Sequence, residues 1–328
     1  MNASAFFLCI AVALLILLLA ICLFVFNNVV WRKTISLPKF IMKMIAGNEM
    51  PTDYDADFDK AYHLFAELPF EKITLTAPDG AKLVGRILVP EKSNGRLIIA
   101  CHGARSSGLG EFAFMGFDLH KSGYTLVLPD HRGCGESDGK FLGYGTHESR
   151  DTLLWLDLAK KRFPDLNIYL LGVSMGGAAV LMMSPEAKSN GIKAIVADCP
   201  YTSAWEEFSY QLKTSFHLPE FPVLHICDLY SRIFAGYSFK AASPREAVKK
   251  ASVPILFIHG TADEFVPCFM QDELYNDCAG EKYKLAVKGA VHARSYYKSP
   301  KEYFSAVEEF FNKEEHRCKH QQPPKNVM

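Results

Sequence analysis

Short apolar runs with few polar interruptions recur along residues 71–313. They lie at 97–101, 124–128, 168–171, 194–197 and 255–258. Strands that are buried on both faces read as continuous apolar runs, whereas half-exposed strands alternate apolar and polar positions. Helical patterns separate the runs, and residues 148–163 place Leu154, Trp155 and Leu158 on one face. We therefore predict an α/β domain with a mostly parallel central sheet and helices on both faces.

Two further patterns bound this domain. Ile73 to Leu75 and Leu83 to Val89 flank a Pro-Asp-Gly turn, which predicts a β-hairpin at its start. Near its end, Ser299-Pro300-Lys301-Glu302 has the features of a helix N-terminus. The polar stretch 314–328 contains a Pro-Pro step, and we predict that it is disordered.

A segment rich in aromatic residues interrupts the second half of the domain. About fifty residues separate the run ending at residue 197 from the run starting at 255, more than an ordinary connection needs. Within it, residues 201–250 show a helical pattern broken by Pro219 and Pro222. The segment is either an extra packing layer or a small helical cap over an active site, and its position favours the cap.

Residues 5–30 carry no charge and are almost wholly apolar, so they predict one transmembrane helix. A cleaved signal peptide or a lipoprotein signal is the alternative. The first four residues lack Lys and Arg, no small-x-small cleavage site follows, and the apolar run continues past Cys22, which favours an uncleaved anchor.

Residues 31–70 then form a linker between the anchor and the domain. The basic residues Arg32, Lys33, Lys39 and Lys43 follow the helix, and the positive-inside rule places the domain in the cytoplasm.

Charge and cysteine content exclude several classes of function. The chain has 36 basic and 36 acidic side chains, so its net charge is zero and would not attract nucleic acid electrostatically. Nine cysteines are irregularly spaced without a Cys-x-x-Cys pair, which predicts neither a disulfide framework nor a zinc site.

A motif typical of a catalytic serine lies at residues 172–177, Gly-Val-Ser-Met-Gly-Gly. It follows the apolar run 168–171 directly and continues into the small-residue stretch 178–183. A strand, a sharp turn and a helix in this order form the nucleophile elbow, in which the serine sits in a strained turn between glycines. We therefore predict that the hydroxyl oxygen of Ser174 projects above the sheet.

Together with three other motifs, this elbow resembles the α/β-hydrolase superfamily. Within it, the chain is similar to membrane-anchored bacterial serine hydrolases of the monoglyceride lipase, serine aminopeptidase and cinnamoyl esterase-like group. The motifs occur in the order that the resemblance implies: Cys101-His102-Gly103-Ala104, Asp130 to Ser137, the elbow, and His259 to Pro267 before a late His292.

The resemblance assigns a catalytic triad. It implies that Ser174 is the nucleophile, that His292 is the general base, and that Asp263 orients His292. Asp198 also ends an apolar run and is the alternative acid, although the resemblance favours Asp263.

The resemblance also assigns supporting residues. It puts the oxyanion-hole donors at the backbone N–H groups of Ala104 and Met175. We expect Arg105 to be solvated rather than in contact with an acidic substrate, and the loop from Asp130 to Ser137 to brace the site.

These features predict a membrane-anchored hydrolase that cleaves a small or lipid-like carboxylic ester through an acyl-serine, without a metal or cofactor. A serine peptidase and a thioesterase would use the same triad on other substrates. A non-catalytic module that binds a membrane ligand is a further alternative. The sequence predicts neither the natural substrate nor the oligomeric state.

Overall fold

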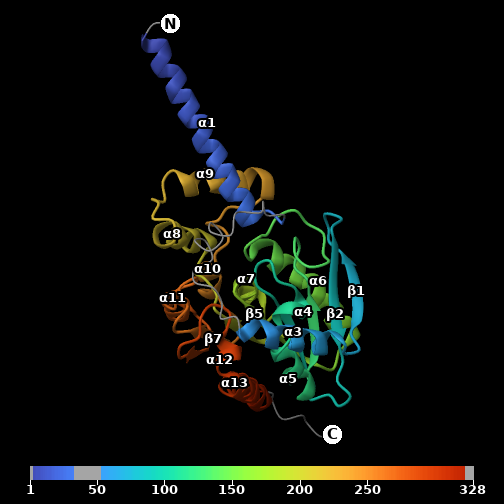
Figure 1. Ribbon diagram of the computed structural model, residues 1–328. Coiled ribbons are helices and arrows are strands. Elements are labelled where there is room, and N and C mark those ends of the chain that lie inside the picture. The colour runs from blue at the N-terminus through green and yellow to red at the C-terminus, as the bar shows by residue number, and fades with distance from the viewer. Residues whose placement is uncertain (1–2, 33–52, 322–328) are drawn as a thin grey trace, which may run out of the picture.

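A mixed sheet forms the centre of the protein, for which a computed structural model describes residues 3–32 and 53–321 (Figure 1). In the described part of the chain the sheet has eight strands in the order β1-β2-β4-β3-β5-β6-β7-β8. β1 pairs antiparallel with β2, and β2 with β4, while every later pairing is parallel. The predicted hairpin and mostly parallel sheet are therefore confirmed. The strands are β1 Glu71–Thr76, β2 Lys82–Leu88, β3 Arg96–Cys101, β4 Thr125–Pro129, β5 Asn167–Val173, β6 Ile192–Asp198, β7 Ile255–Gly260 and β8 Lys282–Val287.

Helices cover both faces of this sheet because its central strands are apolar on both sides. On β3, Ile98 and Ala100 belong to one buried cluster, and Leu97 and Ile99 belong to the other. The first cluster includes residues of α3 Asp53–Ala66, α4 Gly108–Glu111, α5 Met115–Lys121, α12 Ser295–Lys298 and α13 Pro300–Gln321. The second includes residues of α6 Thr146–Arg162, α7 Met175–Met182, α10 Pro244–Val248 and α11 Phe269–Asp277. It also includes Met183 and Ala187, which flank the short 3-10 helix η1 Ser184–Glu186.

The segment between β6 and β7 adds a group of short helices above the sheet edge where the parallel strands end (Figure 1). These are α8 Ala204–Thr214, α9 Val223–Tyr230 and the π-helical turn η2 Ser231–Ala235, followed by α10. Aromatic contacts hold the group together, and the ring centroids of Phe208 and Phe239 lie 4.8 Å apart. This segment corresponds to the inserted residues 201–250, and we refer to it as the cap.

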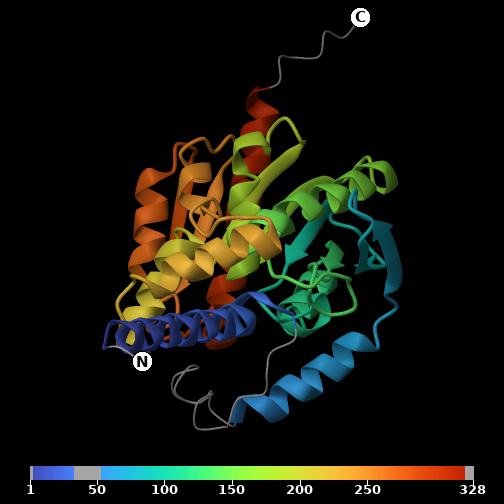
Figure 2. The ribbon, with the colours of Figure 1, turned by 90° about the horizontal axis from the view of Figure 1, so that it is seen from above.

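Helix α1, Ala3–Val30, packs its last turns against the cap while its first turns project away from the domain (Figures 1 and 2). Among the described residues it is the one helix that is long and apolar enough to cross a membrane. Cys22, Phe26 and Val30 are buried. Residues four apart lie on the same face of a helix, so a single stripe of α1 contacts the domain.

Loops of the domain satisfy the backbone carbonyls at the end of α1. The Arg105 guanidinium donates to the carbonyls of Asn28, at 2.7 Å, and Val29, at 3.0 Å. The Leu142 N–H donates to the Val30 carbonyl at 2.8 Å, and the Tyr144 hydroxyl to that of Val29 at 2.9 Å. The last carbonyls of a helix have no partner within it, so these contacts fix the end of α1 to the domain.

Part of the predicted linker 31–70 belongs to the core. Residues 33–52 lie outside the described residues, but Phe65 of α3 is fully buried. A Cβ atom added to Gly116 would lie 2.5 Å from the Phe65 ring, so only glycine fits there. The segment therefore packs against the domain and does more than connect it to α1.

The prediction of a disordered tail from residue 314 is wrong for residues 314–321, which continue α13. The reason is an ion-pair network with Arg96 at the start of β3, whose Nε lies 2.8 Å from Glu315 Oε1 and whose Nη1 lies 3.3 Å from Glu308 Oε2. Asn312 accepts a further hydrogen bond from this guanidinium at 2.5 Å. Residues 322–328 lie outside the described residues.

Replacing Glu315 by Gln should destabilise the protein by about 1–3 kcal/mol, because the largely buried Arg96 loses a charged partner but keeps Glu308. Thermal unfolding of the full chain in detergent micelles measures the effect. Glu309→Gln is the matched control, since Glu309 is exposed on the same helix. Equal unfolding temperatures for the two variants would contradict a structural role of Glu315.

Candidate active site

Ser174 occupies the turn between β5 and α7, with φ 53° and ψ −116°. A positive φ is strained for a residue with a side chain. Glycines on both sides permit the close approach that this turn needs. A Cβ atom at Gly172 would lie 2.2 Å from the Gly176 carbonyl oxygen, and one at Gly176 would lie 2.0 Å from that of Cys101. The local sequence thus has the geometry of a nucleophile elbow.

The structure brings the side chains of Ser174, His292 and Asp263 together. Ser174 Oγ lies 3.0 Å from His292 Nε2, and His292 Nδ1 lies 2.8 Å from Asp263 Oδ2. They follow β5, β8 and β7, three parallel strands whose carboxyl ends meet at one edge of the sheet. Ser174 and Asp263 are buried, and His292 is half-buried. This arrangement can transfer a proton from the hydroxyl to the imidazole.

Asp263 is held ionised by the groups around it. Its Oδ1 accepts hydrogen bonds from the N–H groups of Phe265, at 3.0 Å, and Val266, at 2.9 Å. Burial alone would raise the pKa of this carboxyl, but the contacts with His259 and His292 outweigh it and lower the pKa to about 2. His259 Nε2 lies 3.3 Å from Asp263 Oδ2 and was not singled out as a site residue from the sequence. The feature of the sequence that could have identified His259 as a site residue is its position four residues before Asp263.

Asp198, the alternative acid, lies in a different environment at the same sheet edge. Burial raises its pKa to about 7, and its Oδ1 accepts a hydrogen bond from the Ser295 hydroxyl at 3.0 Å. In the described residues no hydrogen bond joins Asp198 to His292. The carboxylate that contacts the imidazole is therefore that of Asp263.

The two predicted oxyanion donors lie on the loops that follow β3 and β5, which are neighbours in the sheet. Met175 is the first residue of α7, directly after Ser174, and Ala104 follows Gly103. A Cβ atom at Gly103 would lie 3.5 Å from the Ser174 Cβ. Within residues 53–321, neither of the two N–H groups donates a hydrogen bond to another residue. Both N–H groups are thus without an acceptor in this part of the chain.

A buried histidine supports the loop that contains Ala104. His102 Nε2 accepts a hydrogen bond from the His131 N–H at 2.9 Å, which leaves Nδ1 to donate to the Gly103 carbonyl at 2.6 Å. Burial lowers the pKa of His102, so the ring is neutral. The Gly103 N–H in turn donates to Glu111 Oε2 at 3.1 Å. These bonds fix the backbone next to Ser174.

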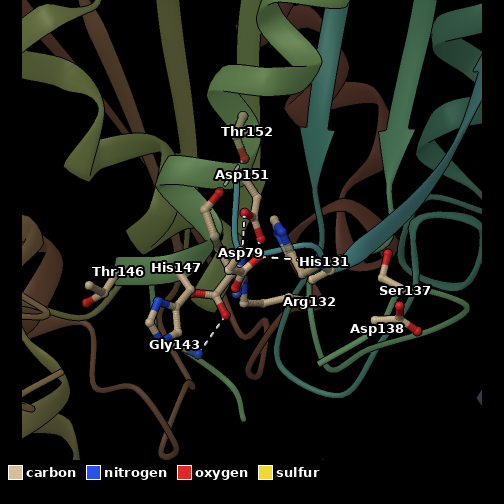
Figure 3. Close-up of polar contacts among 12 residues, drawn as sticks. Asp79, His131, Arg132, Ser137, Asp138, Gly143, Thr146, His147, Asp151 and Thr152 are labelled. Carbon is tan, nitrogen blue, oxygen red and sulfur yellow. Dashed lines mark hydrogen bonds and ion pairs between the residues drawn. The ribbon is translucent and has the colours of Figure 1, made fainter. Parts of the chain in front are cut away.

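The loop from Asp130 to Ser137 braces the site, as predicted. Asp130 accepts hydrogen bonds at 2.9 Å from the N–H groups of Gly108 and Glu136. Figure 3 shows Arg132 beside the carboxylates of Asp79 and Asp151. The contact with Asp151 is bidentate, at 2.6 and 2.7 Å, and this geometry fixes both partners. The loop is therefore tied to the β1–β2 hairpin and to α6.

Arg105 is exposed, as expected, but its guanidinium also binds the carbonyls at the end of α1. Arg105 adjoins Ala104 and has a φ of 62°, which places it in the left-handed region. Its contacts therefore join α1 to the loop that contains Ala104, one of the two predicted oxyanion donors. The sequence could not show this link, because Arg105 and Asn28 are 77 positions apart.

Cys199, Asp263 and His292 place three possible metal-ligand atoms within 4.8 Å of one another. Burial raises the pKa of the Cys199 thiol well above its usual value, so the thiol stays protonated, whereas metals bind the thiolate. Asp263 already accepts hydrogen bonds from two backbone N–H groups and from His292. This donor set fits a hydrogen-bonded acid and base better than a metal centre.

Comparisons with known proteins agree with this geometry. A family model described as the alpha/beta hydrolase fold matches residues 96–218. The uncharacterized protein YqkD of Bacillus subtilis (strain 168) is 29% identical over 276 residues, which cover 82% of this chain and 90% of that protein. Monoglyceride lipase of Mus musculus is 26% identical over 228 residues, which cover 60% of this chain and 75% of the lipase.

Solved structures share the fold. An esterase of Pyrococcus furiosus superimposes with a TM-score of 0.62 at 24% identity, over 81% of this chain and 95% of the esterase. The order of the strands, the turn at Ser174 and these similarities lead to one assignment. The chain has the α/β-hydrolase fold, and it is similar to hydrolases that share this fold.

Proposed function

We propose that this protein is a membrane-anchored serine hydrolase that cleaves a carboxylic ester through an acyl-serine intermediate. The observation that carries the proposal is the hydrogen-bonded chain from Ser174 Oγ through His292 to Asp263. A neutral imidazole between a hydroxyl and an ionised carboxylate can accept a proton and return it. The match to the α/β-hydrolase family model supports hydrolysis, and the esterase and lipase similarities support an ester as the substrate class.

In the acylation step, His292 Nε2 takes the proton of Ser174 as the serine oxygen bonds to the ester carbonyl carbon. The negative charge that develops on the carbonyl oxygen is stabilised by the N–H groups of Met175 and Ala104. Asp263 stabilises the imidazolium that forms. The carbon–oxygen bond to the alcohol then breaks, and the alcohol leaves with the proton from His292.

In the deacylation step, water replaces the alcohol. His292 takes one proton from the water as its oxygen bonds to the acyl carbon, and the same two N–H groups stabilise the second oxyanion. The bond to Ser174 breaks, the serine regains its proton from His292, and the carboxylic acid is released. Both steps use only groups that the chain itself supplies.

An apolar substrate part is supported by the surroundings of His292. The Phe265 ring centroid lies 4.9 Å from the imidazole, and the Phe265 side chain is 46% exposed. Val291, next to the base, is 45% exposed. Exposed apolar side chains beside a catalytic base favour an acyl or alcohol group that avoids water.

We further propose that α1 remains attached as a single membrane anchor with the domain in the cytoplasm. Docking of α1 against the cap supports its retention, and the basic residues that follow it support the orientation. The Arg32 guanidinium also donates to the Gly135 carbonyl at 2.8 Å, which fastens this end of the helix to the domain.

The full chain in detergent micelles should hydrolyse p-nitrophenyl butyrate and react with a fluorophosphonate, and Ser174→Ala should abolish both. Ser189→Ala is the matched control, because Ser189 is an exposed serine away from the elbow. Thioester and aminoacyl-amide substrates tested in parallel address the thioesterase and peptidase alternatives. Faster turnover of either would refute the ester preference, and full activity of Ser174→Ala would refute the serine mechanism.

Asp263→Asn should lower kcat by about 10⁴-fold, because the amide cannot hold the imidazole in the required tautomer or stabilise its charge. Asp198→Asn should lower kcat far less, since Asp198 bonds to Ser295 instead. Steady-state kinetics of the two isosteric variants test the assignment of the acid. A larger loss in Asp198→Asn would reverse it.

Arg105→Ala should lower kcat about tenfold, less than the loss of an entire oxyanion donor, because the loop containing Ala104 loses its attachment to α1. KM and the unfolding temperature should change little, and Arg105→Lys should restore part of kcat. Arg162→Ala serves as the control, since Arg162 pairs with Glu71 at the protein surface. An unchanged kcat in Arg105→Ala would show that the attachment does not position the oxyanion hole.

A further inference from the structure

Large apolar side chains on the cap lie exposed beside α1. Leu229, Ile233 and Phe234 are 53%, 63% and 50% exposed, and we call these three residues the cap face. The Phe234 ring centroid lies 6.1 Å from that of Phe26 in α1. Phe234 of the cap face therefore lies next to the buried stripe of the apolar helix.

The length of α1 that is free of the domain is too short to cross a bilayer. Leu18 is the first residue of α1 that packs with the cap cluster, so about fifteen residues, Ala3 to Leu17, precede the contact. At 1.5 Å per residue they span about 22 Å, whereas the hydrocarbon layer is about 30 Å thick. Tilting the helix would increase this shortfall.

Because the free part of α1 is shorter than the hydrocarbon layer, the cap must lie at the membrane surface or partly within it. About 8 Å more hydrocarbon corresponds to roughly five further residues of α1, to the level of Cys22. Cap residues pack against α1 at this level, where the Tyr230 hydroxyl donates to the Leu19 carbonyl at 3.2 Å. A bilayer thick enough to cover α1 therefore also reaches the cap.

We propose that the cap face lies in the same leaflet as the C-terminal half of α1, so that its partner is the lipid bilayer. The inference rests on the proposed function, because it requires α1 to remain as a membrane anchor. Continuity with an apolar helix favours lipid over a protein partner. Arg232 lies between Leu229 and Ile233 in the chain, and its guanidinium pairs with Asp228 at 2.8 Å, so its charge is already balanced within the cap.

This orientation has a consequence for the substrate. Arg105 joins the end of α1 to the loop beside Ser174, so the catalytic edge of the sheet faces the membrane that α1 enters. An ester embedded in that leaflet would meet the cap before it meets bulk water. The substrate class favoured by this geometry is a lipid-like ester drawn from the bilayer.

Fluorescence quenching in proteoliposomes of phosphatidylethanolamine and phosphatidylglycerol tests the proposal. The full chain receives one cysteine at Ile233, in a background with Cys9, Cys268 and Cys318 replaced by Ser, and is labelled with an environment-sensitive dye. Val89→Cys is the matched control. Val89 is 50% exposed and follows β2 at the opposite edge of the sheet from Ser174.

We expect doxyl-labelled lipid to quench the dye at position 233 severalfold more strongly than at position 89, and aqueous iodide to show the reverse. Strong iodide quenching at position 233 would overturn the proposal. Protection from both quenchers would also overturn it, because it would indicate a protein partner. Resistance to carbonate extraction and fluorophosphonate labelling of Ser174 are measured on the same samples. Their loss would instead identify a failure of the proposed anchor or of the proposed chemistry.

Discussion

The strained backbone at Ser174 is the constraint on which the site depends. A positive φ costs a residue with a side chain about 1–2 kcal/mol, and the surrounding structure must hold it. The Ser174 N–H donates to the Asp198 carbonyl at 2.8 Å, and the Ser174 carbonyl accepts from Ala178 at 2.9 Å. The turn is thus fixed between a buried strand and a helix, and the hydroxyl points to His292 at little further entropic cost.

Two carboxyl groups at the same sheet edge differ because their hydrogen-bond donors differ. Asp263 faces two backbone N–H groups and two histidines, so its charge is stabilised despite burial. Asp198 faces a hydroxyl, and burial dominates its pKa. A group that must stabilise an imidazolium has to remain ionised at the working pH. The local donors therefore determine which of the two carboxyls can support the base, although Asp198 ends β6 and Asp263 closely follows β7.

Local patterns predicted the strands and the elbow, because burial of parallel strands and the geometry of a tight turn determine the types of neighbouring residues. Contacts between residues that are distant in the sequence produce no such local pattern. Glu315 is polar and near the chain end, yet it pairs with Arg96, 219 residues earlier. The prediction of disorder failed for this reason. The sequence likewise placed Asp198 and Asp263 at one edge, but only three-dimensional contacts distinguished the acid that meets His292.

Helix α1 and the α/β domain share a contact surface on which the structure of both depends. The carbonyls at the end of α1 would lack partners in a helix that merely tethered the domain, and only water could then satisfy them. Here Arg105, Leu142 and Tyr144 satisfy them from loops near the serine. The same docking buries Cys22 and Phe26 against the cap. Since one set of contacts both ends the apolar helix and holds a loop of the site, the placement of α1 and the geometry of the active site are coupled.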